Sequence, residues 1–587
     1  MSSRWLLLLL LWVFSASASA DAAVGTAAVD TWYVRPAAEC VNNGDGLAST
    51  CAASAGASGA FNSFSNVIWT ATTGVDDGDT LCVSGKHRET LIPANSGTVA
   101  LPITISLKCN GVTAGTITGA NIESSWTGPD GNGNYTAGTA YTTPLWVLVD
   151  GVVARHGTST GALTSGQWFL TGTTVVYRGD PSEKVIEIAV RGVNIDGSAS
   201  NSSNIIIYGG GASSTGFGAA SGGGRLEATR LIASKAAITF KDCSNISVTG
   251  LTFYAHRGGI DYRGTCHDST GTYNTLTYTG DGLDSNFEAA APYNITYSYN
   301  DVSSTYLGGT NDFLASTVAS HSTTIDKECI ASTFAGNNIR AYRNLAHDCW
   351  TGISFLPNAV VTGYIIESNR VYDIASSGLL LANDGNLAVT QSAIAGNLVE
   401  NTGLSNECNS YGVVHTGATD APGSQVEIVN NMIINAGATL NVNGTAARNS
   451  TGSVLNNVGI QPRCASAPYQ VNMTNWSNRV SANINNNVWY STATQWWRVG
   501  SVRTTFSTFQ SDVTPQETAS VMTNPLLTSI AAPYNLKSTA ASPVRRAGTP
   551  TGACKDVRGR ACYPDSPDIG AYQATSGDPA GPRAPVQ

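Results

Sequence analysis

The chain has 587 residues, of which 62 are Gly and only 12% are charged, with 31 Lys and Arg against 40 Asp and Glu. An average soluble domain has roughly 25% charged residues, so this composition excludes a charge-rich helical protein and a coiled coil. The formal net charge of −9 and the lack of a Lys/Arg run argue against nucleic acid as a partner, because sequence-independent binding of nucleic acid needs a basic surface.

The first 20 residues have the pattern of a secretory signal peptide. Arg4 supplies the positive charge, residues 6–14 are apolar, and small residues precede Asp21. The apolar stretch is shorter than the ~20 residues that cross a bilayer. We therefore expect cleavage after Ala20, a secreted or periplasmic location, and no membrane partner after cleavage.

A weak internal repeat runs through residues 245–490. Each copy combines an Asn or Gly with an alternating apolar pair and a polar break; the Asn positions include Asn300, Asn344, Asn369, Asn397, Asn431 and Asn487. Alternation with period two indicates strands, and we expect the repeated Asn to be a turn residue that tolerates left-handed backbone. One copy cannot bury its own apolar face, but stacked copies can. The repeat predicts an all-β fold, a parallel β-helix solenoid with two or three short strands per coil and a ladder of Asn side chains. A β-sandwich array, the competing arrangement, would show hairpin signals every 8–12 residues, and few are present.

Three parts of the chain resemble known β-helix proteins. Trp32-Tyr-Val-Arg-Pro36 and Pro102-Ile-Thr-Ile105 resemble the first coils of right-handed β-helix polysaccharide-degrading enzymes, among them alginate lyases and chondroitinase B. Trp146-Val-Leu-Val-Asp-Gly151 resembles part of the small β-rich insertion that many β-helix glycoside hydrolases carry, and Pro567-Asp-Ile-Gly-Ala-Tyr572 resembles the closing element of secreted bacterial β-helix proteins. The resemblance implies a secreted right-handed parallel β-helix of the pectate-lyase-like superfamily that cleaves a polysaccharide.

These observations predict the following layout: 1–20 signal peptide, 21–120 N-terminal cap and first coils, 121–200 β-rich insertion, 201–500 main β-helix, 501–573 C-terminal closing segment, and 574–587 disordered tail. The 12 Cys contain no CxxC pair, so in an exported protein we expect disulfides. The local bridges that we predict are Cys40–Cys51, Cys82–Cys109 and Cys554–Cys562.

Charged side chains are expected at matched places on the outer face of neighbouring coils. We take Ile260, Ile325 and Ile353 as inward-facing, which makes the residues one and three positions later face outward: Asp261 and Arg263, Asp326 and Glu328, Ser354 and Leu356. Asp284, after Gly282-Leu283, belongs either to an additional coil or to a loop above this face.

A glycoside hydrolase needs two carboxyl groups, ~5–5.5 Å apart for retention or roughly 6.5–9.5 Å apart for inversion. Adjacent rungs supply the first separation and alternate rungs the second, so Asp261 with Asp326 or Glu328 is the predicted catalytic pair. Arg263 would keep one carboxylate ionised. Asp284, Trp350, His415 and Tyr262 are predicted to contact the substrate.

Two alternatives stay open. A polysaccharide lyase would use Lys327 as the base of a β-elimination, with Ca²⁺ or Arg neutralising the uronate carboxylate, although the Asp-Lys-Glu triplet departs from the lyase pattern. A non-catalytic carbohydrate-binding or adhesin solenoid would bind the glycan without cleaving it. The hydrolase requires no cofactor; a Ca²⁺ ion held by Asp261, Asp326 and Glu328 is a separate hypothesis.

Overall fold

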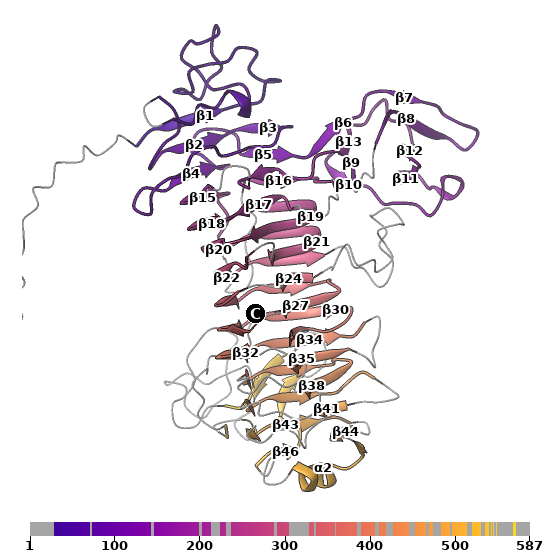
Figure 1. Ribbon diagram of the computed structural model, residues 1–587. Coiled ribbons are helices and arrows are strands. Elements are labelled where there is room, and N and C mark those ends of the chain that lie inside the picture. The colour runs from indigo at the N-terminus through magenta and orange to yellow at the C-terminus, as the bar shows by residue number, and fades with distance from the viewer. Residues whose placement is uncertain are drawn as a thin grey trace, which may run out of the picture.

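The computed structural model describes residues 29–70, 73–141, 146–198, 202–212, 223–230, 236–286, 290–304, 328–333, 336–357, 360–383, 389–404, 410–417, 426–444, 452–464, 469–473, 483–492, 496–499, 501–513, 519–529, 535–538, 542, 544, 547–548 and 568–570. Over these residues the chain is all-β and winds into a right-handed parallel β-helix, as the sequence predicts (Figure 1). The predicted signal peptide, the predicted tail and the pair Cys554–Cys562 lie outside the described residues.

Each regular coil contributes one strand to each of three rows, which we call sheet A, row B and row C. Sheet A contains β1 (Thr31–Val34), β2 (Thr80–Val83), β4 (Ile103–Ser106), β15 (Ile205–Tyr208), β18 (Ile246–Thr249), β20 (His267–Thr272), β22 (Tyr293–Ser298), β25 (Ile339–Tyr342), β29 (Ile365–Glu367), β33 (Ser392–Ala395), β36 (Val426–Val429), β39 (Ser453–Leu455) and β42 (Asn483–Asn485).

Rows B and C are joined by two long strands, β19 (Thr252–Arg263) and β21 (Thr275–Asn286), which run through both. Row B also contains β3 (Gly85–His87), β5 (Gly115–Thr118), β16 (Arg225–Glu227), β23 (Asp301–Ser304), β26 (Leu345–His347), β30 (Arg370–Ile374), β34 (Leu398–Thr402), β37 (Met432–Ile434), β40 (Val458–Ile460), β43 (Val488–Tyr490) and β46 (Val521–Met522). Row C also contains β14 (Ile195–Asp196), β17 (Ile238–Lys241), β24 (Glu328–Thr333), β27 (Thr351–Leu356), β31 (Leu379–Asn383), β35 (Tyr411–Gly417), β38 (Ala438–Gly444), β41 (Tyr469–Met473) and β44 (Trp496–Val499).

Alternation along the strands sends every second side chain into the solenoid. Ile105, Ile207 and Val248 align on successive rungs of sheet A, and all three are fully buried in one continuous core. A shift of one residue would turn such a column outward, so the apolar spacing fixes the register.

The predicted Asn ladder is present at the turn between sheet A and row B. Its members are buried and follow one another up the coils: Asn274, Asn300, Asn344, Asn369, Asn397, Asn431, Asn457 and Asn487. Each Nδ2 from Asn274 to Asn457 donates to Oδ1 of the next Asn at 2.9–3.1 Å and also to a backbone carbonyl. The ladder pairs polar groups that would otherwise be buried without partners.

The left-handed residue of this turn is the one before each ladder Asn, which corrects the expectation that the repeated Asn itself has that conformation. Tyr273 and Tyr299, for example, have φ of 56° and 57°. Where two Asn are adjacent, as in Asn430-Asn431, the first takes the left-handed turn with φ 58° and the second joins the ladder. The ladder residue is therefore selected for its amide and not for backbone freedom.

The β-rich insertion leaves the solenoid after β5 and returns at β14. It consists of two antiparallel sheets, the nearer with β6 (Ala120–Ile122), β9 (Val147–Val149), β10 (Val152–Val153) and β13 (Ile186–Ala189), the farther with β7 (Trp126–Thr127), β8 (Asn134–Ala140), β11 (Trp168–Thr171) and β12 (Thr174–Arg178). Trp168, Tyr177 and Ile188 belong to a core that is separate from that of the solenoid. Figure 1 shows the insertion as an arm that projects from the corner between rows B and C.

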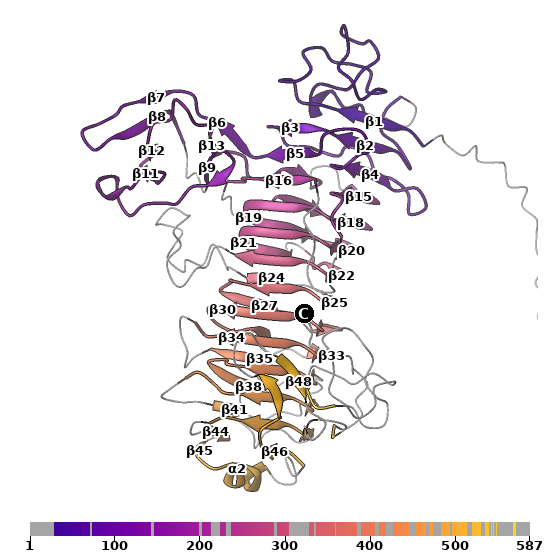
Figure 2. The same ribbon diagram turned by 180° about the vertical axis from the view of Figure 1, so that it is seen from behind.

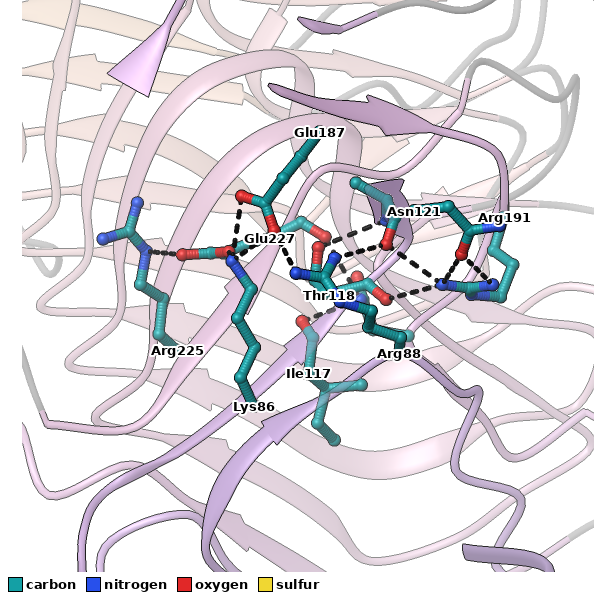
Figure 3. A network of polar contacts seen from close by, with 11 residues as sticks. Lys86, Arg88, Ile117, Thr118, Asn121, Glu187, Arg191, Arg225 and Glu227 are labelled. Carbon is teal, nitrogen blue, oxygen red and sulfur yellow. Dashed lines mark hydrogen bonds and ion pairs between the residues drawn. The ribbon is translucent and has the colours of Figure 1, made fainter. Parts of the chain in front are cut away.

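A network of ion pairs fastens this arm to the solenoid (Figure 3). Glu187 of β13 contacts Nζ of Lys86 at 2.8 Å and Nη2 of Arg88 at 2.5 Å, and Lys86 also contacts Glu227 of β16 at 2.9 Å. The Glu187 side chain is only 2% exposed. Burial opposes its charge, but the hydrogen bonds from Lys86 and Arg88 hold the pKa of Glu187 below its usual value. The insertion is thus attached through paired charges as well as through apolar contact.

The last described segments cover the outer face of row B in the lower coils. Val544 and Ile569 pack on apolar side chains of row B that point outward, among them Met432 and Val458. The C-terminal strands β47 (Leu527–Ser529) and β48 (Asn535–Ser538) lie alongside the lower coils in Figure 2.

The remaining elements are β28 (Val361–Thr362), β32 (Val389–Thr390), β45 (Ser501–Arg503), two 3-10 turns, η1 (Phe64–Asn66) and η2 (Thr160–Ala162), and the helix α2 (Phe506–Val513). None of the helices in the described ranges has the length and apolar character that a membrane span requires.

Four disulfides are described. The predicted bridges Cys40–Cys51 and Cys82–Cys109 are confirmed. Two further bridges, Cys243–Cys266 and Cys329–Cys349, were not predicted. The first of these spans 23 residues, which is the offset between the paired strands β18 and β20, so it links equivalent places on successive coils.

Candidate active site

Two carboxylates lie on adjacent rungs of row C. Asp261 of β19 is directly opposite Asp284 of β21, and their neighbours Ile260 and Leu283 are paired and fully buried in the core. Because side chains alternate along a strand, both aspartates point away from the core. Strands in a sheet lie roughly 4.7–4.9 Å apart, so the register places two acidic side chains side by side on the outer face.

The neighbouring rung corrects the expected register of Asp326 and Glu328. Leu283 pairs with Ile330, and Ile330 pairs with Ile353, so the inward residue of β24 is Ile330 and not Ile325. Ala331 therefore occupies the level of Asp284. Glu328 begins the strand three residues earlier, at the corner between rows B and C. Asp326 and Lys327 lie outside the described residues.

Arg263 holds Asp261 in place. Its Nε donates to Asp261 Oδ2 at 2.5 Å, and its Nη2 contacts the same oxygen. Asp261 is 3% exposed and Arg263 6%, whereas Asp284 is half-buried. A buried guanidinium in contact with a carboxylate favours the ionised form of that carboxylate. The two aspartates thus share a face but differ in burial, Asp284 being the more exposed of the two.

A second pair of acids lies at the corner, about 10 Å along the strands from the first pair, since three residues at ~3.3 Å each separate them. Asp281 is two residues before Leu283, and Glu328 is two residues before Ile330, so they stand at the same level of neighbouring rungs. Both are buried, and Nη2 of Arg257 lies 3.6 Å from Asp281 Oδ2. We call Asp261, Arg263, Asp281, Asp284, Glu328 and Arg257 the acidic patch.

Asp281 and Arg257 are site residues that were not predicted from the sequence. The signal was present, because Asp281-Gly-Leu-Asp284 repeats Gly258-Gly-Ile-Asp261 with an offset of 23 residues. An alignment of those two segments identifies Asp284 as the counterpart of Asp261 and places Asp281 at the corner.

Trp350 lies on the rung next to that of Glu328. Trp350 is half-buried and directly precedes Thr351, which pairs with Glu328. Its position at the corner is compatible with the predicted contact to a substrate.

The prediction that Tyr262 and His415 contact the substrate is wrong, because both side chains face the interior. Tyr262 is fully buried in the core, where its hydroxyl donates to the Thr270 carbonyl at 2.7 Å. His415 aligns with the core residues Leu381 and Val442, is 5% exposed, and donates from Nδ1 to the Leu381 carbonyl at 3.0 Å. Neither side chain lies on the outer face where a polysaccharide would bind.

Of the three residues of the hypothesised Ca²⁺ site, Asp261 and Glu328 are described and Asp326 lies outside the described residues. Within the described part of the chain, no three His, Cys, Asp or Glu side chains come together in a way that could hold a metal ion. Asp261 and Glu328 are on different levels of the strands and two rungs apart, which follows from the register of β21 and β24.

No protein-family model matches the chain, and no curated protein sequence matches it. Solved structures with a similar fold include XylC in complex with xylose, at 11% identity and a TM-score of 0.49, covering 85% of this chain and 87% of that one. A lacto-N-biosidase from Eubacterium ramulus matches at 11% identity and a TM-score of 0.38, over 84% of this chain and 67% of that one. The pectate lyase Pel9A matches at 11% identity and a TM-score of 0.34, over 93% and 98%. At these identities the similarity concerns the fold, so the side chains of the acidic patch carry the functional argument.

Proposed function

We propose that the protein is an exported glycoside hydrolase that cleaves a polysaccharide at Asp261 and Asp284. The observation that supports this proposal is the register that pairs the two aspartates on adjacent rungs. The spacing of ~4.8 Å between strands is close to the ~5–5.5 Å between carboxyl groups in retaining enzymes. Asp284 thus takes the place of Asp326 or Glu328 as the partner of Asp261, and the expected two-carboxylate chemistry stays the same.

The surroundings of the two aspartates divide their roles. Asp261, ionised beside Arg263, is the nucleophile. Asp284 is next to that negative charge, and since like charges repel, it is the better site for a proton and serves as the general acid. Asp284 protonates the glycosidic oxygen while Asp261 bonds to the anomeric carbon and the glycosidic bond breaks. Water then attacks the glycosyl-enzyme, giving up a proton to Asp284 and releasing Asp261.

Small residues flank the acid pair along the same outward column. Thr239 pairs with Asp261 on one side, and Ala331 stands beyond Asp284 on the other, where it pairs with Ser354. These flanking side chains are small, and each of them is at most 2% exposed. Trp350 at the corner offers an aromatic face, which packs against the apolar C–H face of a pyranose.

The test is a panel of neutral and acidic polysaccharides incubated with the full-length chain, followed by mass analysis of the products. We expect new reducing ends, retention of the anomeric configuration, and a loss of about 10²–10⁴-fold in kcat for both Asp261→Asn and Asp284→Asn. Asp512→Asn is the matched control, because Asp512 is an exposed carboxylate of α2, outside the acidic patch, and it should keep wild-type turnover.

Three other outcomes would each exclude part of the proposal. Unsaturated products that absorb near ~232 nm, as conjugated enoates do, would identify a lyase, and Lys327→Ala would then abolish turnover. Binding without cleavage across the panel would identify a carbohydrate-binding solenoid. Hydrolysis that continues at the wild-type rate in both aspartate variants would move the active site elsewhere.

A further inference from the structure

The insertion contains a cleft of its own. It has a volume of about 460 Å³ and lies at the edge between the two sheets of the arm. Its lining includes Ile122 of β6, Trp126 of β7, Tyr135 of β8, and Pro181 with Lys184 of the loop between β12 and β13. All of its lining residues belong to the insertion. Clefts of about 300–1,000 Å³ are typical of sites for small molecules.

The aromatic side of the cleft is held in a fixed position. The Trp126 indole donates from Nε1 to the Glu123 carbonyl at 3.1 Å and packs against Tyr177, with ring centroids 6.2 Å apart. Tyr135 is directly opposite Tyr177 across the sheet, so both rings lie on its inner face. Since these rings are positioned before any ligand arrives, a ligand that stacks on them pays little ordering cost.

The loop beneath Trp126 is anchored by a buried carboxylate. Glu123 is 4% exposed and accepts hydrogen bonds from the Tyr141 hydroxyl at 2.6 Å and from the Ser125 amide at 2.7 Å. Its two oxygens thus fix the segment between β6 and β7. The cleft is preformed on the side from which Trp126 projects.

The rim of the cleft is polar, and Lys184 on this rim is paired with an acid. Lys184 contacts Asp150 at 2.9 Å, and Asp180 accepts a hydrogen bond from the Ser182 amide at 2.9 Å. Asp180, Ser182 and Lys184 are exposed and can still bond to a ligand's hydroxyl groups. Because Lys184 already has an acidic partner, the rim does not present an uncompensated positive charge to an anion.

We propose that this cleft binds one or two neutral pyranose units and thereby anchors a glycan chain at a site separate from the acidic patch. An aromatic floor stacks on the C–H face of a sugar, and polar rim groups bond to its hydroxyls. The choice of a glycan as ligand rests on the proposed function. Figure 1 shows the sheet of β7, β8, β11 and β12 on the side of the arm that is far from the solenoid.

The test is isothermal titration calorimetry of the full-length protein with neutral gluco-, xylo-, manno- and galacto-configured di- to tetrasaccharides. The Asp284→Asn variant is used as the parent, because it limits turnover. We expect Trp126→Ala and Tyr135→Ala each to weaken binding of one of these sugars by about tenfold or more. Val152→Ala is the matched control: Val152 is 62% exposed in the same insertion but does not line the cleft, and its variant should bind like the parent.

Several results would overturn the inference. It fails if no neutral saccharide binds, or if Trp126→Ala and Tyr135→Ala bind like Val152→Ala. Should Trp126→Ala disturb folding in near-UV circular dichroism, Trp126→Phe, which keeps an aromatic face, and Tyr135→Ala decide the question. In the wild-type background, Trp126→Ala should leave turnover of a disaccharide substrate within about twofold of the wild-type rate. It should slow only the cleavage of the polymer. Binding that depends on Trp126 in a chain without any hydrolase activity would keep this inference and reject the proposed function.

Discussion

Removing one member of the Asn ladder should destabilise the whole solenoid. The Asn397 side chain takes part in four hydrogen bonds: it donates to the Ile366 carbonyl and to Asn431 Oδ1, both at 2.9 Å, and it accepts from the amide and the Nδ2 of Asn369 at 2.9 and 3.0 Å. Asn397→Ala removes all four and leaves two buried donors of Asn369 without partners. At ~1–3 kcal/mol for each unsatisfied donor, we expect a loss of about 2–6 kcal/mol in the free energy of unfolding.

A matched control removes an equivalent amide bond at the surface. Asn338 is exposed, has φ of 59°, and donates from Nδ2 to Asn294 Oδ1 at 2.8 Å. The equivalent residue of the next coil is Gly363, with φ of 75°, so Asn338→Gly keeps a permitted backbone. We expect this variant to change the free energy of unfolding by less than about 1 kcal/mol, because water replaces the lost partner.

The measurement is guanidinium chloride unfolding of both variants and the wild type, followed by far-UV circular dichroism. Equal losses in Asn397→Ala and Asn338→Gly would refute the reasoning, because burial of the amide would then have no energetic consequence. A shift in slope without a shift in midpoint would also count against it, since the argument concerns the native state.

Two further predictions concern charged groups. Glu187→Ala should lower the free energy of unfolding by roughly 2 kcal/mol, because Lys86 and Arg88 lose a buried partner, and limited proteolysis should then cleave the insertion sooner; unchanged proteolysis would contradict this. Burial alone would lower the pKa of His347, but hydrogen bonds to Asp301 and Asp348, at 3.1 and 2.7 Å, raise it to about 9. Its stabilisation is therefore complete below pH ~6.5 and is lost as the pH rises through 9, by up to roughly 3 kcal/mol. Thermal midpoints across pH 6–10 should show this loss in the wild type and not in His347→Gln; the same loss in both would exclude His347 as its source.

The solenoid could be predicted because its signals are local and repeated. Asn300, Asn344 and Asn369 recur with the same apolar neighbours, and stacking is the arrangement that buries those neighbours together. The role of the Asn was harder to predict, because Asn suits both a left-handed turn and a buried amide ladder, and only the register shows that residues such as Tyr299 take the turn.

The candidate site could be predicted only in part. Asp261 and Arg263 follow the clear strand of Ile260, and the structure pairs them as expected. The predicted register of β24 was wrong, because the sequence between Ser304 and Glu328 contains no copy of the repeat from which the register could be continued. Ile325 and Ile330 are equally apolar, so the sequence did not show which of them faces inward. The prediction that Tyr262 contacts the substrate was wrong for a different reason. An aromatic side chain can either stack on a sugar or pack in a core, and because Tyr262 comes one residue after the outward-facing Asp261, it faces the core.

The ladder must be kept in this architecture, whereas the length of each coil can change. Successive members are 25 to 44 residues apart, yet the hydrogen bonds between them are alike in length. Coil length is thus free to vary at the corners while the joint between coils stays constant. A new loop grafted at the corner of rows B and C would alter what borders the acidic patch without altering how one coil recognises the next. The residues that can change ligand preference, at the corner, are therefore different from the ladder Asn residues that preserve the scaffold. A designer could exchange the corner residues and leave the ladder untouched.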